Sequence, residues 1–121
     1  MLISMLKAKL HQARVTGADI DYVGSITIDQ ALLEKAGMVA YERVLVVNVE
    51  NGARFETYII PGEAESGTIE LNGAAARLVA IGDRLIVMAF CQVEAPPPED
   101  WAPRVVFLDA QNRVRTVEGG G

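Results

Sequence analysis

The chain has 121 residues, of which 50% are hydrophobic and 22% charged, and this composition favours one compact folded domain over a disordered chain. Eleven lysine and arginine residues against 16 aspartate and glutamate residues give a net charge of −5, which argues against nucleic acid or an anionic membrane as the main partner. The single cysteine, Cys91, excludes an intrachain disulfide, and the single histidine, His11, excludes a His-rich metal site. We expect Cys91 to be a buried, small apolar side chain.

The first apolar residues form a stretch too short for the core of a signal peptide. The longest later apolar run, residues 85–91, is far shorter than the ~20 residues that span a bilayer. The sequence therefore predicts a cytoplasmic protein.

The first predicted strand covers residues 7–16. Because strand side chains alternate between faces, Lys7, Lys9 and His11 are expected on one face. Residues 17–19, Gly-Ala-Asp, are expected to end this strand.

The clearest predicted helix covers residues 30–36. Asp29 is suited to cap its first turn, and Gly37 stands where a left-handed residue commonly ends a helix. Residues 22–28, before this helix, have the composition of a strand that a glycine–serine pair interrupts.

A hairpin is predicted next, with strands at residues 39–49 and 54–60 joined by a two-residue turn at Asn51-Gly52. On a regular second strand, one face carries Arg54, Glu56 and Tyr58, and the other carries Phe55, Thr57 and Ile59.

The rest of the chain also indicates short strands and turns. Further strands are predicted at residues 68–71, 84–93, 104–108 and 114–117, with Asn72-Gly73 leading into three alanines. Many short strands with a few short helices make the protein mainly β, and a small β-barrel is the expected architecture.

Gly24-Ser25 is the candidate reactive pair of residues. A serine hydroxyl can attack the carbonyl carbon of the preceding peptide bond and turn that amide into an ester. The ester can eliminate and cut the chain, and the remnant of the serine then hydrolyses to a pyruvoyl group. Gly24 permits the backbone distortion that the attack requires. An ordinary turn is the alternative interpretation of the pair.

Residues 22–30, Tyr-Val-Gly-Ser-Ile-Thr-Ile-Asp-Gln, resemble the processing segment of the pyruvoyl-dependent aspartate 1-decarboxylase family. Four further stretches, in the same order as in that family, are similar to its other motifs: residues 5–11, 48–58, 71–76 and 79–83. The resemblance extends over residues 1–93 and is loose beyond Cys91.

The resemblance implies a double-psi β-barrel in a homotetramer, with active sites between neighbouring subunits. It implies decarboxylation of L-aspartate to β-alanine and CO2, which supplies pantothenate and coenzyme A biosynthesis. The chain would cut itself into residues 1–24 and 25–121. The pyruvoyl group derived from Ser25 would then form an imine with the substrate amine, without a metal or pyridoxal phosphate.

The resemblance also implies the residues of the site. Ser25 and Tyr58 are the expected catalytic residues, with Tyr58 as the acid that reprotonates the carbanion. Gly24, Ser25 and Thr57 are the expected processing residues, with the Thr57 hydroxyl stabilising the oxyanion at the Gly24 carbonyl. The expected substrate-binding residues are Lys9, Arg54, Thr57, Asn72, Gly73, Ala74 and Ala75, and the candidate site-lining residues are His11 and Tyr22.

Arg54 presents a guanidinium fork that suits a carboxylate. Thr57 would share a site with Arg54 and Tyr58 only if the strand twists or carries a bulge, because a regular strand points Thr57 to the opposite face.

Two alternatives stay open at the level of sequence. The chain is a non-catalytic β-barrel that serves as an interaction module, or a pyruvoyl enzyme that decarboxylates another amino acid. Val23 stands where some family members have an acidic residue, and Val47 where some have tryptophan. Val23 bears on the rate of self-cleavage and on whether a maturation factor takes part.

Overall fold

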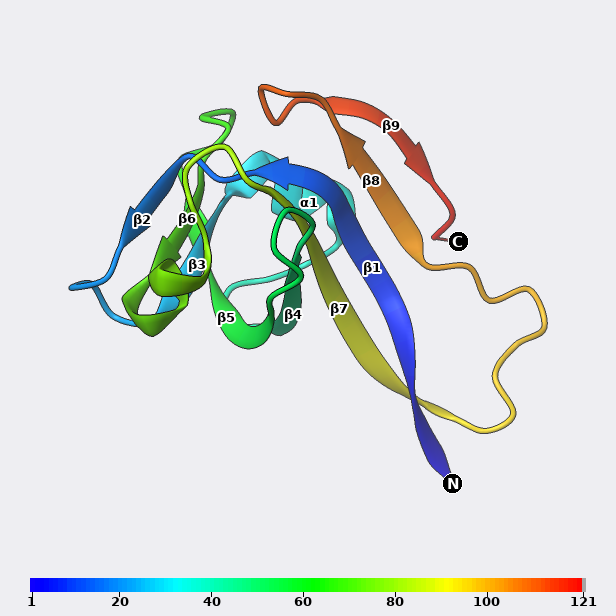
Figure 1. The fold of residues 1–121 in the computed structure, drawn as a ribbon. Coiled ribbons are helices and arrows are strands. Elements are labelled where there is room, and N and C mark those ends of the chain that lie inside the picture. Colours follow the sequence, from blue (N-terminus) through cyan, green and yellow to red (C-terminus); the bar gives the residue numbers. More distant parts are fainter. Residues whose placement is uncertain (121) are drawn as a thin grey trace.

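The computed structural model describes residues 1–120, which are mostly strands (Figure 1). In this range the elements are β1 (Leu2–Arg14), β2 (Gly17–Asp19), β3 (Ser25–Asp29), α1 (Gln30–Ala36), β4 (Arg43–Asn48), β5 (Arg54–Gly62), β6 (Ile69–Asn72), the 3-10 helix η1 (Gly73–Leu78), β7 (Arg84–Glu94), β8 (Arg104–Leu108) and β9 (Val114–Glu118). The prediction of a mainly β protein with a few short helices is confirmed.

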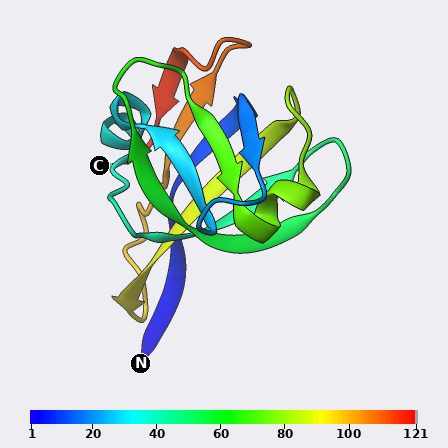
Figure 2. The same ribbon diagram turned by 90° about the vertical axis from the view of Figure 1, so that its left-hand side faces the viewer.

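One strongly curved sheet contains these strands in the order β2-β6-β3-β5-β4-β7-β1-β8-β9. Its pairs are antiparallel except β1 with β8, β2 with β6 and β3 with β5, which are parallel. In residues 1–120, β2 and β9 are the two edges, so the sheet has a barrel-like curvature without closing on itself (Figure 2). The N-terminal half of β1 and the C-terminal half of β7 extend beyond the curved part as a two-stranded arm (Figure 1).

The core fills the inside of this curve with aliphatic side chains from alternate positions of the strands. The largest of those that are fully buried are Leu10, Ile26, Ile28, Ile59, Ile69, Leu71, Leu85, Val44, Val46 and Val87, together with Val15 and the helix residue Leu33. Because side chains alternate along a strand, the neighbours of these residues point to the outer face. Most of the polar candidates discussed below, Thr57 excepted, lie among those neighbours.

Helix α1 is confirmed at its predicted bounds. The Asp29 carboxylate accepts a hydrogen bond of 2.8 Å from the backbone N–H of Ala31, and Gly37 ends the helix at φ 73°. The same carboxylate accepts the backbone N–H groups of Glu65 and Gly67, both at 2.9 Å. Asp29 therefore joins the end of β3 to the loop before β6.

Two predictions about the N-terminal part are wrong. The first strand begins at Leu2 rather than at residue 7, because residues 2–6 pair with the C-terminal half of β7. Residues 17–19 do not end the β structure but form β2, which pairs in parallel with β6. Both partners lie far along the chain, where local composition gives no signal.

The predicted two-residue turn at Asn51-Gly52 is also wrong. Residues 49–53 connect β4 to β5, and only Gly52 of the pair has a positive φ, of 75°. The Asn51 side chain instead accepts the backbone N–H of Ala53 and donates to the carbonyl oxygen of Leu78. This wider loop directs the start of β5 toward Val47.

Cys91 differs from its prediction as well. It is partly buried on β7 and lines a surface cavity of about 530 Å³ together with Ser4, Arg43, Glu56 and Phe90. Within the described residues, none of the helices is long and apolar enough to cross a membrane.

Candidate active site

Ser25 is the first residue of β3 and is only 1% exposed, although Gly24 before it lies in an exposed turn. The Ser25 hydroxyl donates to the carbonyl oxygen of Val23 at 3.1 Å and accepts from the Asn72 side-chain amide at 3.0 Å. The predicted nucleophile is thus buried and held by two hydrogen bonds next to a solvent-exposed peptide bond.

Asn72 faces Ser25 directly, because the two residues are partners in the antiparallel ladder of β3 and β6. Asn72 is 3% exposed, and its amide nitrogen also donates to the Thr27 hydroxyl at 3.1 Å. Both amide protons therefore go to hydroxyl groups on the outer face of β3. The nitrogen of the Asn72 amide, and not its oxygen, therefore faces Ser25.

Gly73, Ala74 and Ala75 follow Asn72 as the first turn of η1. Gly73 is buried, Ala75 is partly buried and Ala74 is exposed. In Figure 2 this helix lies beside the turn that connects β2 to β3, which contains Tyr22 and Gly24. Gly73 thus borders the turn before Ser25, while the substrate contact expected of Gly73, Ala74 and Ala75 stays a prediction.

Thr57 and Tyr58 lie on β5, the other neighbour of β3. The parallel ladder begins with Ile26 paired with Ile59, so Ser25 and Tyr58 each stand one residue before its first pair, and Gly24 lies in the bend before β3. Tyr58 is partly buried, and its ring stacks on that of Tyr41 at a centroid distance of 6.3 Å.

Of the two features that would bring Thr57 to the face of Arg54 and Tyr58, a twist or a bulge, the pairing of β5 with β4 shows no bulge. This pairing is regular, with Thr57 opposite the buried Val44 and Tyr58 opposite Arg43. Thr57 therefore faces the core side of the sheet. Tyr58, the next residue, points to the outer face, as Ser25 does.

Arg54 is exposed at the start of β5, opposite Val47. It lies on the same face as Tyr58, about 13 Å away along the strand. Both side chains are long, so a small ligand between them is within reach of each. Tyr22, 56% exposed, lies in the turn before Gly24 and does not line an enclosed site within the described chain.

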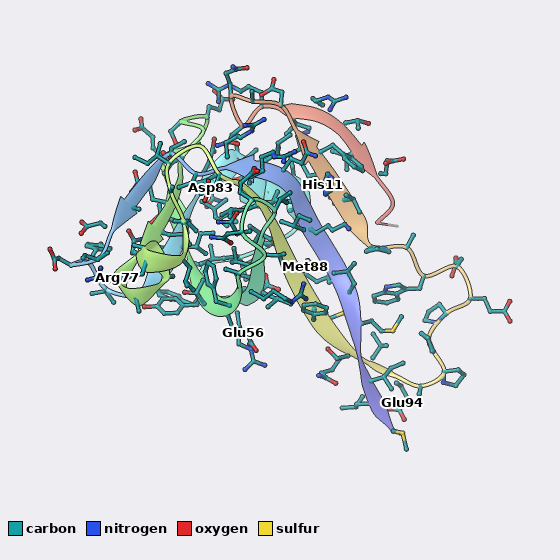
Figure 3. All side chains as sticks on the ribbon, viewed as in Figure 1. His11, Glu56, Arg77, Asp83, Met88 and Glu94 are labelled. Atoms are coloured by element: carbon teal, nitrogen blue, oxygen red, sulfur yellow. The ribbon has the colours of Figure 1, made fainter. Side chains whose placement is uncertain are left out.

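Lys9 and His11 are not brought to this group. Lys9 pairs with Met88, Met88 with Leu45 and Leu45 with Glu56, so β1 lies three strands from β5, about 14 Å across the sheet. Figure 3 shows the same order, with Met88 between His11 and Glu56. In one chain the two basic residues are therefore remote from Ser25.

His11 lies half-buried on β1 with its ring edge against Phe107, at a centroid distance of 5.3 Å. Its Nδ1 atom is buried and has no hydrogen-bond partner within residues 1–120. Desolvation by burial, and secondarily the charge of Lys9, lower the pKa of His11 below its ordinary value. The imidazole is thus biased toward its neutral form.

Two residues near Ser25 were missed by the sequence reasoning. Thr27 shares the Asn72 amide with Ser25, and the period of two along β3 could have indicated its place on the same face. Tyr41 stacks on Tyr58 from the loop before β4, where it adopts φ 67° and is 74% exposed. No local pattern indicates that contact.

The described residues contain no group of three or more His, Cys, Asp or Glu side chains placed to hold a metal ion. Neither Gly24 nor Ser25 lines the surface cavities of about 530, 450 and 380 Å³. The candidate group thus combines the buried Ser25 and Asn72 with the exposed Gly24 and Arg54.

Comparison with known proteins identifies the family of this chain. Residues 1–115 match the family described as aspartate decarboxylase. The chain belongs to that family. Its members include the aspartate 1-decarboxylase of Leptospira biflexa, which is 56% identical over 114 residues that cover 93% of this chain and 97% of the relative.

Two further members of the family show similar agreement. The aspartate 1-decarboxylase of Caldicellulosiruptor saccharolyticus is 54% identical over 114 residues, covering 94% of this chain and 89% of the relative. That of Clostridium novyi is 49% identical over 117 residues, covering 97% and 95%. The match includes residues 94–115, which lie beyond the resemblance noted in the sequence.

Proposed function

We propose that this chain decarboxylates L-aspartate to β-alanine and CO2 with a pyruvoyl group that it makes from its own Ser25. Membership of the aspartate decarboxylase family supports the reaction. The product would supply pantothenate and coenzyme A biosynthesis. Location in the cytoplasm stays a prediction from the sequence.

The observation that carries the proposal is the environment of Ser25. Ser25 is 1% exposed and its hydroxyl lies between the Asn72 amide and the Val23 carbonyl, whereas Gly24, on the other side of the peptide bond, is exposed. A serine in an ordinary surface turn would have its hydroxyl in water. Burial with two partners restricts the rotamers of Ser25, and restricted geometry favours an intramolecular attack.

The proposed role of Thr57 in self-cleavage follows from its place on β5, a strand that pairs with β3. Attack by the Ser25 hydroxyl places negative charge on the Gly24 carbonyl oxygen. Thr57, on β5 just before the residues that pair with β3, would donate its hydroxyl to that oxygen. The cut would give residues 1–24 and 25–121.

The Asn72 amide, which donates to the Ser25 hydroxyl, would be placed to donate to a ketone oxygen at the start of β3. When formed, the pyruvoyl group supplies an electron sink for loss of the α-carboxylate. Tyr58 would hold the proton that returns to the substrate carbon. Arg54 would bind a substrate carboxylate through its guanidinium, and Asn72 with the first turn of η1 would border the substrate.

Lys9 and His11 reach this group only if a second subunit supplies them. Both lie three strands from β5 in their own chain, and Ser25 lines none of the three cavities. We therefore propose a homotetramer with sites between neighbouring subunits. A maturation factor stays an open part of this proposal, because Val23 replaces the acidic residue of some family members.

Denaturing mass spectrometry before and after warm incubation tests the proposal. We expect fragments of residues 1–24 and 25–121, with a ketone at the start of the larger one, and turnover of L-aspartate. Ser25→Ala should remain intact and inactive, and a Ser25→Ala protein that still decarboxylates aspartate would refute the mechanism.

The alternative of a non-catalytic barrel predicts an intact wild-type chain. Cleavage without turnover of aspartate would instead favour a different amino acid as substrate. A substrate without a second carboxylate would leave Arg54 without its partner, so acidic amino acids are the first to test.

A further inference from the structure

Gly73 lies directly against the cleavage segment. A Cβ atom built on Gly73 would lie 2.6 Å from the Gly24 Cα, 2.9 Å from the Gly24 nitrogen and 3.2 Å from the Tyr22 carbonyl oxygen. The first two distances are shorter than real Cβ contacts, and all three atoms belong to the backbone. A side chain at position 73 would therefore push residues 22–24 away from η1.

The same contact fixes Gly24 relative to Ser25. Ser25 is held in the ladder by Asn72, and Asn72 immediately precedes Gly73. Two consecutive residues thus contact the two reacting groups. Asn72 holds the Ser25 hydroxyl, and Gly73 borders the backbone of Gly24, whose carbonyl is attacked. Displacing Gly24 would change the approach of the hydroxyl to the carbonyl carbon while leaving Ser25 paired with Asn72.

We propose that Gly73 is a positioning residue for self-cleavage. Its missing side chain lets Gly24 lie against η1, where the Gly24 carbonyl carbon is presented to the Ser25 hydroxyl. This inference rests on the proposed function. It gives Gly73 a role in self-cleavage, before any substrate binds, in addition to the substrate contact expected there.

The step concerned is the acyl shift. The Ser25 Oγ bonds to the Gly24 carbonyl carbon, the bond from that carbon to the Ser25 nitrogen breaks, and the hydroxyl proton passes to the nitrogen. The product is an ester with a free amine, which hydroxylamine cleaves although it spares the amide. The ester then loses the Cα proton and the Gly24 carboxylate, and water converts the dehydroalanine into the pyruvoyl group and ammonia.

Gly73→Ala and Gly37→Ala separate the steric contact from backbone strain. Gly73 has φ 69° and Gly37 has φ 73°, so an alanine is similarly strained at both positions. Only position 73 meets other atoms, because nothing lies within 4 Å of a Cβ at Gly37. Gly37 also lies at the end of α1, outside the candidate site.

Freshly synthesised wild-type, Gly73→Ala and Gly37→Ala chains are incubated without aspartate, with and without hydroxylamine, and cleavage is followed by denaturing mass spectrometry. We expect Gly37→Ala to cleave within about twofold of the wild-type rate. Gly73→Ala should cleave about tenfold more slowly or worse, without accumulating a hydroxylamine-sensitive ester, because misplacement of reacting atoms by an ångström has effects of this size.

Cleavage of Gly73→Ala at the wild-type rate would overturn the inference, and so would an accumulating ester, which would place the block after the acyl shift. A thermal melt in the Ser25→Ala background, where neither chain cleaves, tests for folding. Loss of the cooperative transition there would assign Gly73 a purely structural role. An intact wild-type chain would overturn the proposed function and this inference with it.

Discussion

Tyr58 lies beside Ser25 in the register of β3 and β5 and points to the same outer face, which suits an acid that returns a proton to the substrate. The change Tyr58→Phe removes the hydroxyl but keeps the ring that stacks on Tyr41. We expect normal self-cleavage with turnover reduced about 100-fold or more, measured as CO2 release from aspartate. Unchanged turnover would remove Tyr58 from the role of the acid.

Arg54 is exposed and is not committed to an ion pair among the described side chains, unlike Arg43 and Arg84, which pair with Glu56 and Glu50. Its guanidinium is therefore available to a ligand carboxylate. Arg54→Ala should raise the KM for aspartate about tenfold or more and leave cleavage at Gly24-Ser25 near the wild-type rate. Arg43→Ala is the control on the next strand. Equal loss of processing and binding would contradict the assignment.

At the scale of elements, Asp29 links three pieces of the fold. Its carboxylate accepts backbone N–H groups from Ala31, Glu65 and Gly67, and it is 1% exposed. Asp29→Ala should lower the free energy of unfolding by about 3 kcal/mol, because it removes a helix cap and leaves buried donors without partners. Chemical denaturation in the Ser25→Ala background measures this on an uncut chain.

Asp109→Ala is the matched control for Asp29→Ala. Asp109 accepts the backbone N–H groups of Gln111 and Arg113 in the turn between β8 and β9, where the carboxylate is exposed to solvent. Its loss should cost about 1 kcal/mol or less. Similar costs for the two changes would show that the loop before β6 does not depend on Asp29.

The sequence predicts elements well where the signal is local. Asp29 and Gly37 define α1 correctly, because both caps act within one turn of the helix. The strand at residues 17–19 is missed because its stability depends on β6. The turn at residues 49–53 is wrong because the Asn51 side chain bonds to Ala53 within the loop and to Leu78 of η1.

The candidate site shows the same limit. The resemblance placed Ser25, Tyr58 and Asn72 together, and the ladders of β3 with β5 and β6 agree with this grouping. The contact between Gly73 and Gly24 could not be predicted, because it depends on where η1 packs after the strands have paired. The separation of Lys9 from β5 likewise follows from strand order, which composition does not contain.

At the scale of the whole molecule, the distance of Lys9 from β5 allows a test by mixed subunits. Lys9→Ala alone should lose most turnover, and full activity would remove Lys9 from the site. Coexpression of Lys9→Ala with Ser25→Ala should restore up to about a quarter of the wild-type activity, because random assembly creates sites with both residues intact.

The control for the mixed subunits is Tyr58→Phe coexpressed with Ser25→Ala. Tyr58 and Ser25 are neighbours within one chain, so this pair should restore no activity. Failure of the Lys9→Ala mixture to regain activity would contradict a site shared between subunits.

The proposed cut falls between β2 and β3, and this position determines what the mature protein would be. Residues 1–24 contain β1, which is hydrogen-bonded to both β7 and β8, and β2, which is hydrogen-bonded to β6. Breaking the peptide bond removes none of these ladders. The short product should therefore stay bound through strand pairing alone, so that native gel filtration finds one species where denaturing conditions release two.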